Sequence, residues 1–454
     1  MEKKQIKING KIAVEIKING GLFWKAGGPG PSEPNKLVYS ANAAGSTITV
    51  NGEAVTLEQG DNITLDYPNE ITSVIATDNT ALTYIQIPNT VTSIEDGDYN
   101  TGSFYKCTAL ASVSLPDTMT MIGNYAFSGC NKLASINIPE SVKSIGNGAF
   151  YDCTSLTSVT LPEGITTIND NTFNGCTALS SINIPESVKS IGQGAFQDCT
   201  SLASVTLPEG ITTINKNTFN GCSSLVSVNI PNTVTKIEDG SYGNGAFYNC
   251  TSLASVTLPD SLTSIGSFAF KGCNKLASIN ITESVKSIGN GAFSNCTSLA
   301  SVTLPNTITT MGRAIFADCT SLTSVTLPDT ITNFDSVNIF NGCSSLTSVT
   351  LPDNMTIIGA AAFMDCTELA SINIPESVTS FEGSAFRGCN KLASITIPSG
   401  VKSINYRAFA NCSALTDFNY NGTMSQWASI TKGNEWNLNS AFLVVHCTDG
   451  DVSI

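Results

Sequence analysis

Charged side chains are scarce in this 454-residue chain, of which they make up only 13%. Basic residues are the rarer kind, since 22 Lys and Arg stand against 36 Asp and Glu and leave a net charge of −14. Nucleic-acid binding rests mainly on Lys and Arg that neutralise phosphates, and anionic lipid surfaces attract the same residues. The composition therefore argues against nucleic acid as a partner and against docking on a membrane surface.

Histidine is almost absent, and His446 is its single copy. Imidazole is the side chain that most often serves as general acid, general base or metal ligand near neutral pH. One histidine leaves almost no capacity for such chemistry. We therefore expect no His-based catalytic site and no cofactor.

Long apolar runs are missing as well. No stretch approaches the roughly 18 consecutive apolar residues of a membrane-spanning helix. Residues 1–10 alternate charged side chains with Ile and lack the apolar core of about 7–15 residues that a secretory signal contains. We expect no membrane insertion and no cleaved signal, which leaves an intracellular location, export by another route to the outside or the cell surface, or a place in a virus particle.

Cysteine, in contrast, is abundant and regularly spaced. Successive copies among the first fourteen are separated by 23 residues, except for one interval of 28 and one of 24. A Phe lies three residues before each of these Cys and a Leu three residues after it. A fixed period in this range is the signature of a solenoid. The fourteen positions are Cys107, Cys130, Cys153, Cys176, Cys199, Cys222, Cys250, Cys273, Cys296, Cys319, Cys343, Cys366, Cys389 and Cys412.

Each apolar slot of the repeat has a predictable role. A Phe, a Cys and a Leu at i, i+3 and i+6 share one face of a short 3₁₀-like or helical turn and form a structural ladder. The Leu then opens a short strand whose alternate residues point inward, and a Pro, which has no N–H, ends that strand. Such a coil cannot bury its apolar side alone, so neighbouring coils must stack. Two successive sets of ladder residues are Phe150, Cys153, Leu156 and Phe173, Cys176, Leu179.

The repeat resembles the BspA-like, or Treponema-type, leucine-rich repeat over about three quarters of the chain. The resemblance rests on segments such as Leu156-Thr-Ser-Val-Thr-Leu-Pro162, Val188-Lys-Ser-Ile191 and Gly194-Ala-Phe-Gln-Asp-Cys199. It implies an α/β solenoid, a right-handed coil with a parallel sheet on its concave side and about 14–15 repeats of 23 residues. It also implies a surface adhesin or recognition protein. An earlier unit, at 82–88, follows Asn79 where a Cys is expected and represents the first coil.

The flanking sequences do not follow the repeat. The pattern predicts a β-rich N-terminal segment at 1–26, a Gly/Pro linker at 27–35, an N-terminal cap at 36–78, the solenoid at 79–420 and a C-terminal cap at 421–454. Two Trp in the C-terminal segment are expected to cover the last apolar face, because solenoid ends must be capped.

Two coils carry matching insertions, which we expect to form edge loops on the same side of the solenoid. The edge-loop residues are Asp96, Asp98, Tyr99, Asp239 and Tyr242. The Asp-x-Asp spacing of the first insertion suggests a weak calcium site, but the Glu that closes an EF-hand loop is replaced by Cys107. A solvated acidic turn is the simpler interpretation.

Three candidate chemistries have simple structural explanations. The regular Cys occupy inward slots, where a free thiol acts as a small hydrophobe rather than as half of a disulfide. His446-Cys447 with Asp449 could be half of a metal site, although a strand and turn explain the same residues. No carboxylate pair or nucleophile differs from its repeat copies, and catalysis needs a unique constellation. We therefore expect no enzyme and no resident metal.

The outward strand positions are the candidate ligand face. They alternate with the inward residues and carry only Ser, Thr and Asn, which either keep the sheet soluble or make weak multivalent contacts. The residues selected for this face are Ser135, Asn137, Ser158, Thr160, Ser181, Asn183, Ser204, Thr206, Ser227, Asn229, Ser255 and Thr257.

The sequence therefore predicts a non-enzymatic adhesion or recognition protein that meets a protein or glycan on a host or neighbouring cell. The alternative is a phage fibre or other virion component, attached to further virion proteins through residues 1–26. This alternative is motivated by the β-patterned N-terminal segment, its Pro/Gly linker and the expected lack of a signal peptide.

Overall fold

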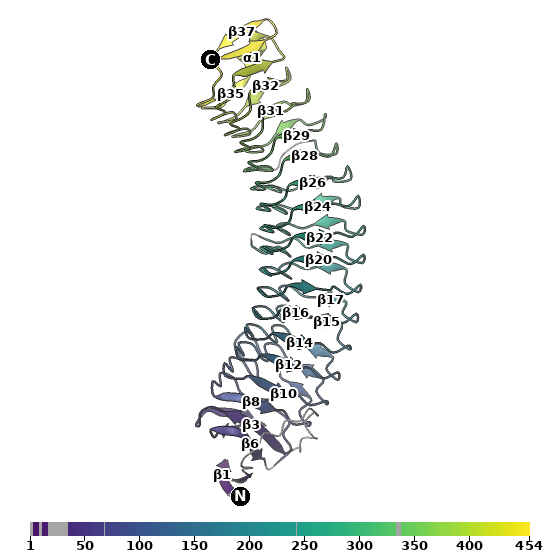
Figure 1. The fold of residues 1–454 in the computed structure, drawn as a ribbon, viewed down its shortest axis with the longest axis vertical. Coiled ribbons are helices and arrows are strands. Elements are labelled where there is room, and N and C mark those ends of the chain that lie inside the picture. Colours follow the sequence, from purple (N-terminus) through teal and green to yellow (C-terminus); the bar gives the residue numbers. More distant parts are fainter. Residues whose placement is uncertain (1–2, 9–10, 17–34, 68, 242, 333–336) are drawn as a thin grey trace. The chain divides into compact units, whose positions relative to one another are not determined.

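The computed structural model describes residues 3–8, 11–16, 35–67, 69–241, 243–332 and 337–454. It forms two compact units, residues 1–211 and 212–454. Both units are built from the same stacked coils (Figure 1). The expected solenoid of about fourteen 23-residue turns is confirmed, and its strands pair in parallel from coil to coil.

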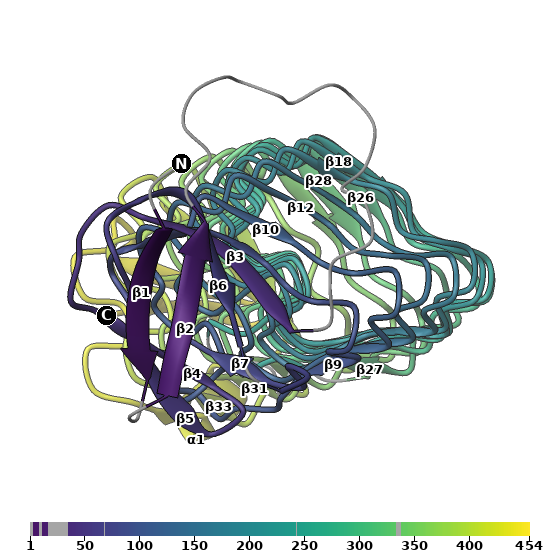
Figure 2. The same ribbon diagram turned by 90° about the horizontal axis from the view of Figure 1, so that it is seen from below.

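One coil illustrates all of them. Strand β14 (Ser158–Thr160) exposes its first and last residues and buries Val159. A turn at Pro162 leads to β15 (Thr167–Ile168), which lies on a second side of the coil and buries Ile168. Figure 2 looks along the coils of the first unit and shows β10 and β12 on one side, with β9 on the other. Each coil therefore contributes one strand to each of two parallel ladders.

The strands that continue the β14 position form the sheet face. In the first unit they are β8 (Leu82–Gln86), β10 (Ser112–Ser114), β12 (Ser135–Asn137), β14, β16 (Ser181–Ile182) and β18 (Ser204–Val205). In the second unit they are β20 (Ser227–Asn229), β22 (Ser255–Thr257), β24 (Ser278–Asn280), β26 (Ser301–Thr303), β28 (Ser324–Thr326), β29 (Ser348–Thr350), β32 (Ser394–Ile397), β34 (Asp417–Tyr420) and β36 (Val444–Cys447).

The strands that continue the β15 position form the second face. In the first unit they are β9 (Ser93–Ile94), β11 (Met121–Ile122), β13 (Ser144–Ile145), β15 and β17 (Ser190–Ile191). In the second unit they are β19 (Thr213–Ile214), β21 (Lys236–Ile237), β23 (Ser264–Ile265), β25 (Ser287–Ile288), β27 (Thr310–Met311), β30 (Ile357–Ile358), β31 (Ser380–Phe381), β33 (Ser403–Ile404) and β35 (Thr431–Lys432).

The third side of each coil, expected as a 3₁₀-like or helical turn, is a chain of tight turns. The Cys153 N–H donates to the Phe150 carbonyl at 3.2 Å, and the Leu156 N–H donates to the Cys153 carbonyl at 3.0 Å. The N–H groups of Phe150 and Asp152 instead donate to the next coil. A helix cannot form here because alternate N–H groups serve a neighbouring coil and Asp152 has a left-handed φ of 54°.

Antiparallel strands cover the first coil. Strands β3 (Lys36–Ala41) and β6 (Gly60–Asp66) pair with each other, and β3 also pairs with β8. Strands β4 (Thr47–Val50), β5 (Glu53–Thr56) and β7 (Val74–Ile75) form a second small sheet. Strands β1 (Lys3–Ile8) and β2 (Lys11–Ile16) form an antiparallel hairpin, a two-stranded sheet of their own. Most of the predicted linker at 27–35 lies outside the described residues.

The Asn79 side chain joins the first coil to its cap. Its amide donates to the Thr47 carbonyl at 2.9 Å, while its oxygen accepts from the N–H groups of Ala81 and Leu82. A Cys could not satisfy all these groups, since a thiol offers one weak donor. The departure from the repeat at Asn79 is therefore part of the cap.

The C-terminal cap contains α1 (Met424–Ser429), the only helix assigned in the described ranges, and the edge strand β37 (Gly450–Ser453). Thr423 and Gln426 form a capping box at the start of α1. Trp427 and Trp436 are both buried, with their ring centroids 5.9 Å apart, and Trp427 also contacts Phe418 of the last repeat. These two rings pack against the apolar end of the last repeat.

Candidate functional site

The sheet face carries two columns of small polar side chains. The first and third residues of its strands lie outward, and all of the twelve residues selected from the sequence are exposed. Register aligns them from coil to coil, with Ser135 opposite Ser158 and Asn137 opposite Thr160. Later exposed members of the same columns are Ser278, Asn280, Ser301, Thr303, Ser324, Thr326, Ser348, Thr350, Ser371, Asn373, Ser394 and Thr396.

The columns are held in place by the buried ladder beneath them. The side chains of Phe150, Cys153, Leu156, Phe173, Cys176 and Leu179 have no solvent exposure. The Phe150 and Phe173 rings stack nearly parallel with their centroids 5.5 Å apart, and the same stacking continues within each unit. Offset stacking of this kind adds to the stabilisation that burial of each ring provides.

The ladder cysteines act as small hydrophobic residues with a directed thiol. The Cys176 Sγ donates to the Phe150 carbonyl of the preceding coil at 3.1 Å, and equivalent contacts recur from Cys107 to Cys412. The fourteen are free and buried. Burial raises the pKa of Cys107, Cys296, Cys343 and Cys412 to about 12, and it also raises the pKa of Cys130, Cys153, Cys273 and Cys389 above its ordinary value. These thiols are therefore protonated at neutral pH and unsuited to nucleophilic or metal chemistry.

The sheet face changes character at its C-terminal end. On β34, Asp417 and Asn419 take the places that Ser394 and Thr396 hold on β32. His446 on β36 lies opposite Asn419, and Asp451 on β37 lies opposite His446. The neutral columns of Ser, Thr and Asn therefore end in two carboxylates and an imidazole.

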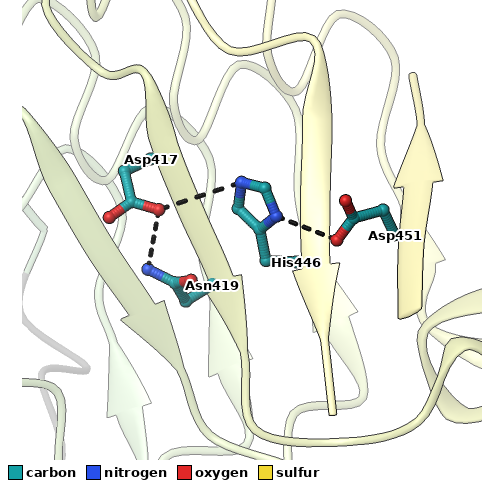
Figure 3. A network of polar contacts seen from close by, with 4 residues as sticks. All are labelled: Asp417, Asn419, His446 and Asp451. Carbon is teal, nitrogen blue, oxygen red and sulfur yellow. Dashed lines mark hydrogen bonds and ion pairs between the residues drawn. The ribbon is translucent and has the colours of Figure 1, made fainter. Parts of the chain in front are cut away.

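These end residues form a polar network that Figure 3 shows. The His446 Nδ1 lies 2.9 Å from Asp451 Oδ1, while its Nε2 lies 4.0 Å from Asp417 Oδ1. The Asn419 amide donates to the same Asp417 oxygen at 3.0 Å. The side chains of His446, Asp417 and Asp451 are 45%, 53% and 64% exposed. The network therefore places two solvent-accessible carboxylates and an imidazole at the end of the polar columns.

The grouping of His446 with Cys447 and Asp449 that the sequence suggested differs from this arrangement. His446 instead faces Asp417 and Asp451, while the Asp449 carboxylate accepts from the Met424 N–H at 2.7 Å and caps α1. Within the described ranges, no three His, Cys, Asp or Glu side chains form a group suited to a metal ion. The half-site interpretation is not supported by this geometry.

The first insertion is a structured loop. The Asp96 carboxylate accepts from the Asn124 N–H of the next coil at 2.8 Å, and the Asp98 carboxylate accepts from the Asn100 N–H at 2.8 Å. The Asn100 N–H and then the Thr101 hydroxyl lower the pKa of Asp98. Both carboxylates are thus engaged in local structure, which favours the acidic-turn interpretation over a calcium loop.

The second insertion is anchored in the same way. The Asp239 carboxylate accepts from the Ser267 N–H at 2.9 Å and from its hydroxyl at 3.1 Å. Tyr242, the remaining edge-loop residue, lies outside the described residues.

Tyr99 stands at the centre of an aromatic group that the sequence reasoning missed. Its ring is 56% exposed and meets Tyr125 and Tyr151 edge-on, with centroids 5.8 and 5.6 Å away. Tyr125 and Tyr151 come from the two following coils. Their signal in the sequence is that the similar coils that follow carry Asn171 and Gln197 at the positions equivalent to Tyr125 and Tyr151.

No helix in the described ranges has the length and apolar composition that a membrane crossing needs.

Comparisons with known proteins match the repeat. The family model described as "BspA type Leucine rich repeat region (6 copies)" matches residues 69–188, 120–245, 240–339 and 336–441. A search of curated proteins found no match.

Several solved structures resemble the chain. A leucine-rich repeat protein from Bacteroides ovatus is 26% identical over 87% of this chain and 91% of its own, with a TM-score of 0.55. A leucine rich cell surface protein from Faecalibacterium prausnitzii is 29% identical over 79% of this chain and 96% of its own, with a TM-score of 0.46. The Treponema pallidum leucine-rich repeat protein is 33% identical over 40% of this chain and 83% of its own, with a TM-score of 0.35.

Proposed function

Because the chain belongs to the BspA-type leucine-rich repeat family, we propose that it is a recognition or adhesion protein that binds its ligand on the sheet face. Repeat proteins of this class act by binding, and their stacked strands present an extended surface for a partner. The proposal includes a place at a cell surface or outside the cell, and no catalytic step.

The observation that carries the proposal is the pair of exposed polar columns. Neighbouring strands lie about 4.8 Å apart, so hydroxyl and amide groups recur at that spacing along each unit. Each contact is weak because it exchanges a hydrogen bond with water for one with the ligand. Many contacts to a repetitive partner add through effective concentration, so a glycan or a repetitive protein surface is the ligand class that this face suits.

The end network at Asp417, His446 and Asp451 extends the proposal. These residues continue the two columns, and the carboxylates of Asp417 and Asp451 add charged acceptors where the neutral Ser, Thr and Asn residues end. A ligand lying along the columns would meet them last. We propose that they contribute orientation rather than most of the affinity.

The phage-fibre alternative has no comparable support. It depends on an attachment role for residues 1–26, of which the described part is the hairpin β1 and β2. The family match bears on the repeats at 69–441 and adds nothing for a virion component.

A binding screen tests the proposal. The purified chain is applied to a glycan array and to an array of cell-surface proteins, alongside a variant that carries Thr160→Glu, Thr206→Glu and Thr257→Glu. The proposal expects at least one saturable ligand for the parent chain and its loss in the variant, because three carboxylates interrupt the columns without touching the buried ladder. Binding that is unchanged in the variant would contradict the sheet face as the ligand surface.

A further inference from the structure

The aromatic group at the first insertion recurs 143 residues later in the chain. Glu95-Asp96-Gly97 corresponds to Glu238-Asp239-Gly240, Tyr105 to Tyr248, and Tyr125 to Phe268. The geometry recurs too, since the Tyr125 ring covers Gly148 and the Phe268 ring covers Gly291, so that a Cβ on either glycine would collide with the ring above it. The chain therefore carries two copies of one aromatic edge.

Both copies hold an aromatic residue where the backbone disfavours one. Tyr125 has a φ of 50° and Phe268 a φ of 58°, in the left-handed region that costs every residue with a Cβ. Equivalent positions with the same backbone carry small or polar residues in ten other coils, at Gly148, Asn171, Gly194, Asn217, Gly291, Ala314, Asn338, Ala361, Ser384 and Arg407. The two copies are therefore distinguished by the aromatic ring itself, which no other coil carries at this position.

The second copy shows what its rings attract. The Lys271 ammonium lies 5.6 Å from the centroid of Phe268 and 5.8 Å from that of Tyr248. These distances fit a cation–π contact. In the first copy the residue equivalent to Lys271 is Ser128, which is buried and uncharged.

The first copy instead gathers tyrosines. Tyr99 and Tyr151 join Tyr125, and burial and then the hydrogen bond with Tyr99 raise the pKa of Tyr151. Its own cation, Lys106, lies over the neighbouring Tyr105 ring at 4.9 Å. Among the described residues, no ammonium or guanidinium is placed over the rings of Tyr99, Tyr125 or Tyr151.

The charge around this cluster is negative. Glu95, Asp96 and Asp98 lie exposed on the insertion that carries Tyr99, and Asp152 follows Tyr151. Lys106 is the one basic residue that accompanies them on this insertion and the turn after it. Tyrosine and arginine are the side chains that most often dominate the affinity of protein interfaces, and the guanidinium stacks well on aromatic rings.

We propose that Tyr99, Tyr125 and Tyr151, here called the tyrosine cluster, bind an arginine or lysine side chain of a protein partner, with the acidic insertion supplying the opposite charge. This inference rests on the proposed recognition function. It adds a second contact surface, on the turn edge rather than the sheet face, and it specifies the chemistry of the partner.

The chain itself supplies variants that should fold. Tyr125→Asn introduces the residue found at Asn171 with the same left-handed backbone, and Tyr151→Gln introduces the residue found at Gln197 in a nearly identical coil. Tyr99→Ala removes the exposed ring, and Tyr406→Ala is the matched control, because Tyr406 is also about half exposed on a distant coil.

The test titrates the full chain with a peptide of three arginines spaced by Gly-Ser, followed by NMR of isotope-labelled tyrosine rings. A peptide with citrulline in place of arginine is its neutral counterpart. We expect the tyrosine cluster to respond first. Affinity should fall by about fivefold or more for Tyr99→Ala, for Tyr125→Asn with Tyr151→Gln, and for the citrulline peptide, while Tyr406→Ala leaves it unchanged.

Three results would overturn the inference: equal binding of the citrulline peptide, no loss in the cluster variants, or a neutral glycan that binds through the cluster in place of the peptide. The Thr160→Glu, Thr206→Glu and Thr257→Glu variant separates the two proposals. This variant should retain peptide binding at the tyrosine cluster even where its sheet-face ligand is lost. Failure of the sheet-face proposal can therefore be distinguished from failure of the tyrosine-cluster proposal.

Discussion

The thiol ladder predicts a specific cost for removing one of its members. Cys176 has no solvent exposure, and its Sγ donates to the Phe150 carbonyl at 3.1 Å. In Cys176→Ala, loss of one methylene-sized group costs about 1 kcal/mol of transfer free energy. A residual cavity of about 20 Å³ adds about 0.5 kcal/mol, and the lost weak hydrogen bond adds about 0.5 kcal/mol. The expected loss of unfolding free energy is about 2 kcal/mol.

Urea unfolding, monitored by circular dichroism, measures this loss. An unchanged m-value shows that the variant exposes the same amount of surface on unfolding as the parent chain. Cys447→Ala is the matched control, because Cys447 is the one cysteine outside the ladder and is only partly buried. It should cost less than about 0.5 kcal/mol. Equal losses in the two variants would refute the argument that the ladder slot, rather than the residue type, sets the cost.

Two further predictions concern titration. Thiol labelling of the folded chain at pH 8 should modify Cys447 quickly and the fourteen ladder cysteines only after unfolding, and rapid labelling of most of them would show that the ladder is open. Burial and then the hydrogen bond with Glu53 raise the pKa of Tyr67 to about 12. Between about pH 10 and pH 12 the unfolded chain loses this proton while the folded chain keeps it, so stability falls as pH rises through that window. Tyr67→Phe should make the loss shallower, and a loss of unchanged slope in this variant would rule out Tyr67 as its source.

The stacked coils could be predicted from the sequence because each slot repeats. The spacing of Phe, Cys and Leu predicted which side chains are buried, and the alternation around Val159 predicted that Ser158 and Thr160 are exposed. A sequence signal for the turns was also present. The residue before each ladder Cys is Gly, Asn or Asp in every coil except at Lys106, and each of these residues has a left-handed φ. At Gly175 the lack of a Cβ also leaves room for the Asp152 side chain of the preceding coil.

Contacts between unlike repeats could not be predicted in the same way. The network of Asp417, His446 and Asp451 depends on the register of three strands, two of which lie outside the repeat pattern. The tyrosine cluster depends on an insertion that lifts Tyr99 against two later coils. Periodicity specifies what equivalent positions share, whereas both sites arise where equivalent positions differ.

The central claim, that the sheet face binds the ligand, is tested most directly by comparing substitutions on the two strand-bearing faces of the stacked coils. One variant carries Thr160→Glu, Thr206→Glu and Thr257→Glu on the sheet face, and the other carries Ser144→Glu, Ser190→Glu and Thr310→Glu at exposed positions of the second face. Both add the same charge at exposed strand positions, so adhesion of the purified chains to ligand-bearing cells isolates the effect of the face. The account predicts that the first variant loses adhesion and the second keeps it. Equal adhesion of the two variants, or loss in the second alone, would contradict it.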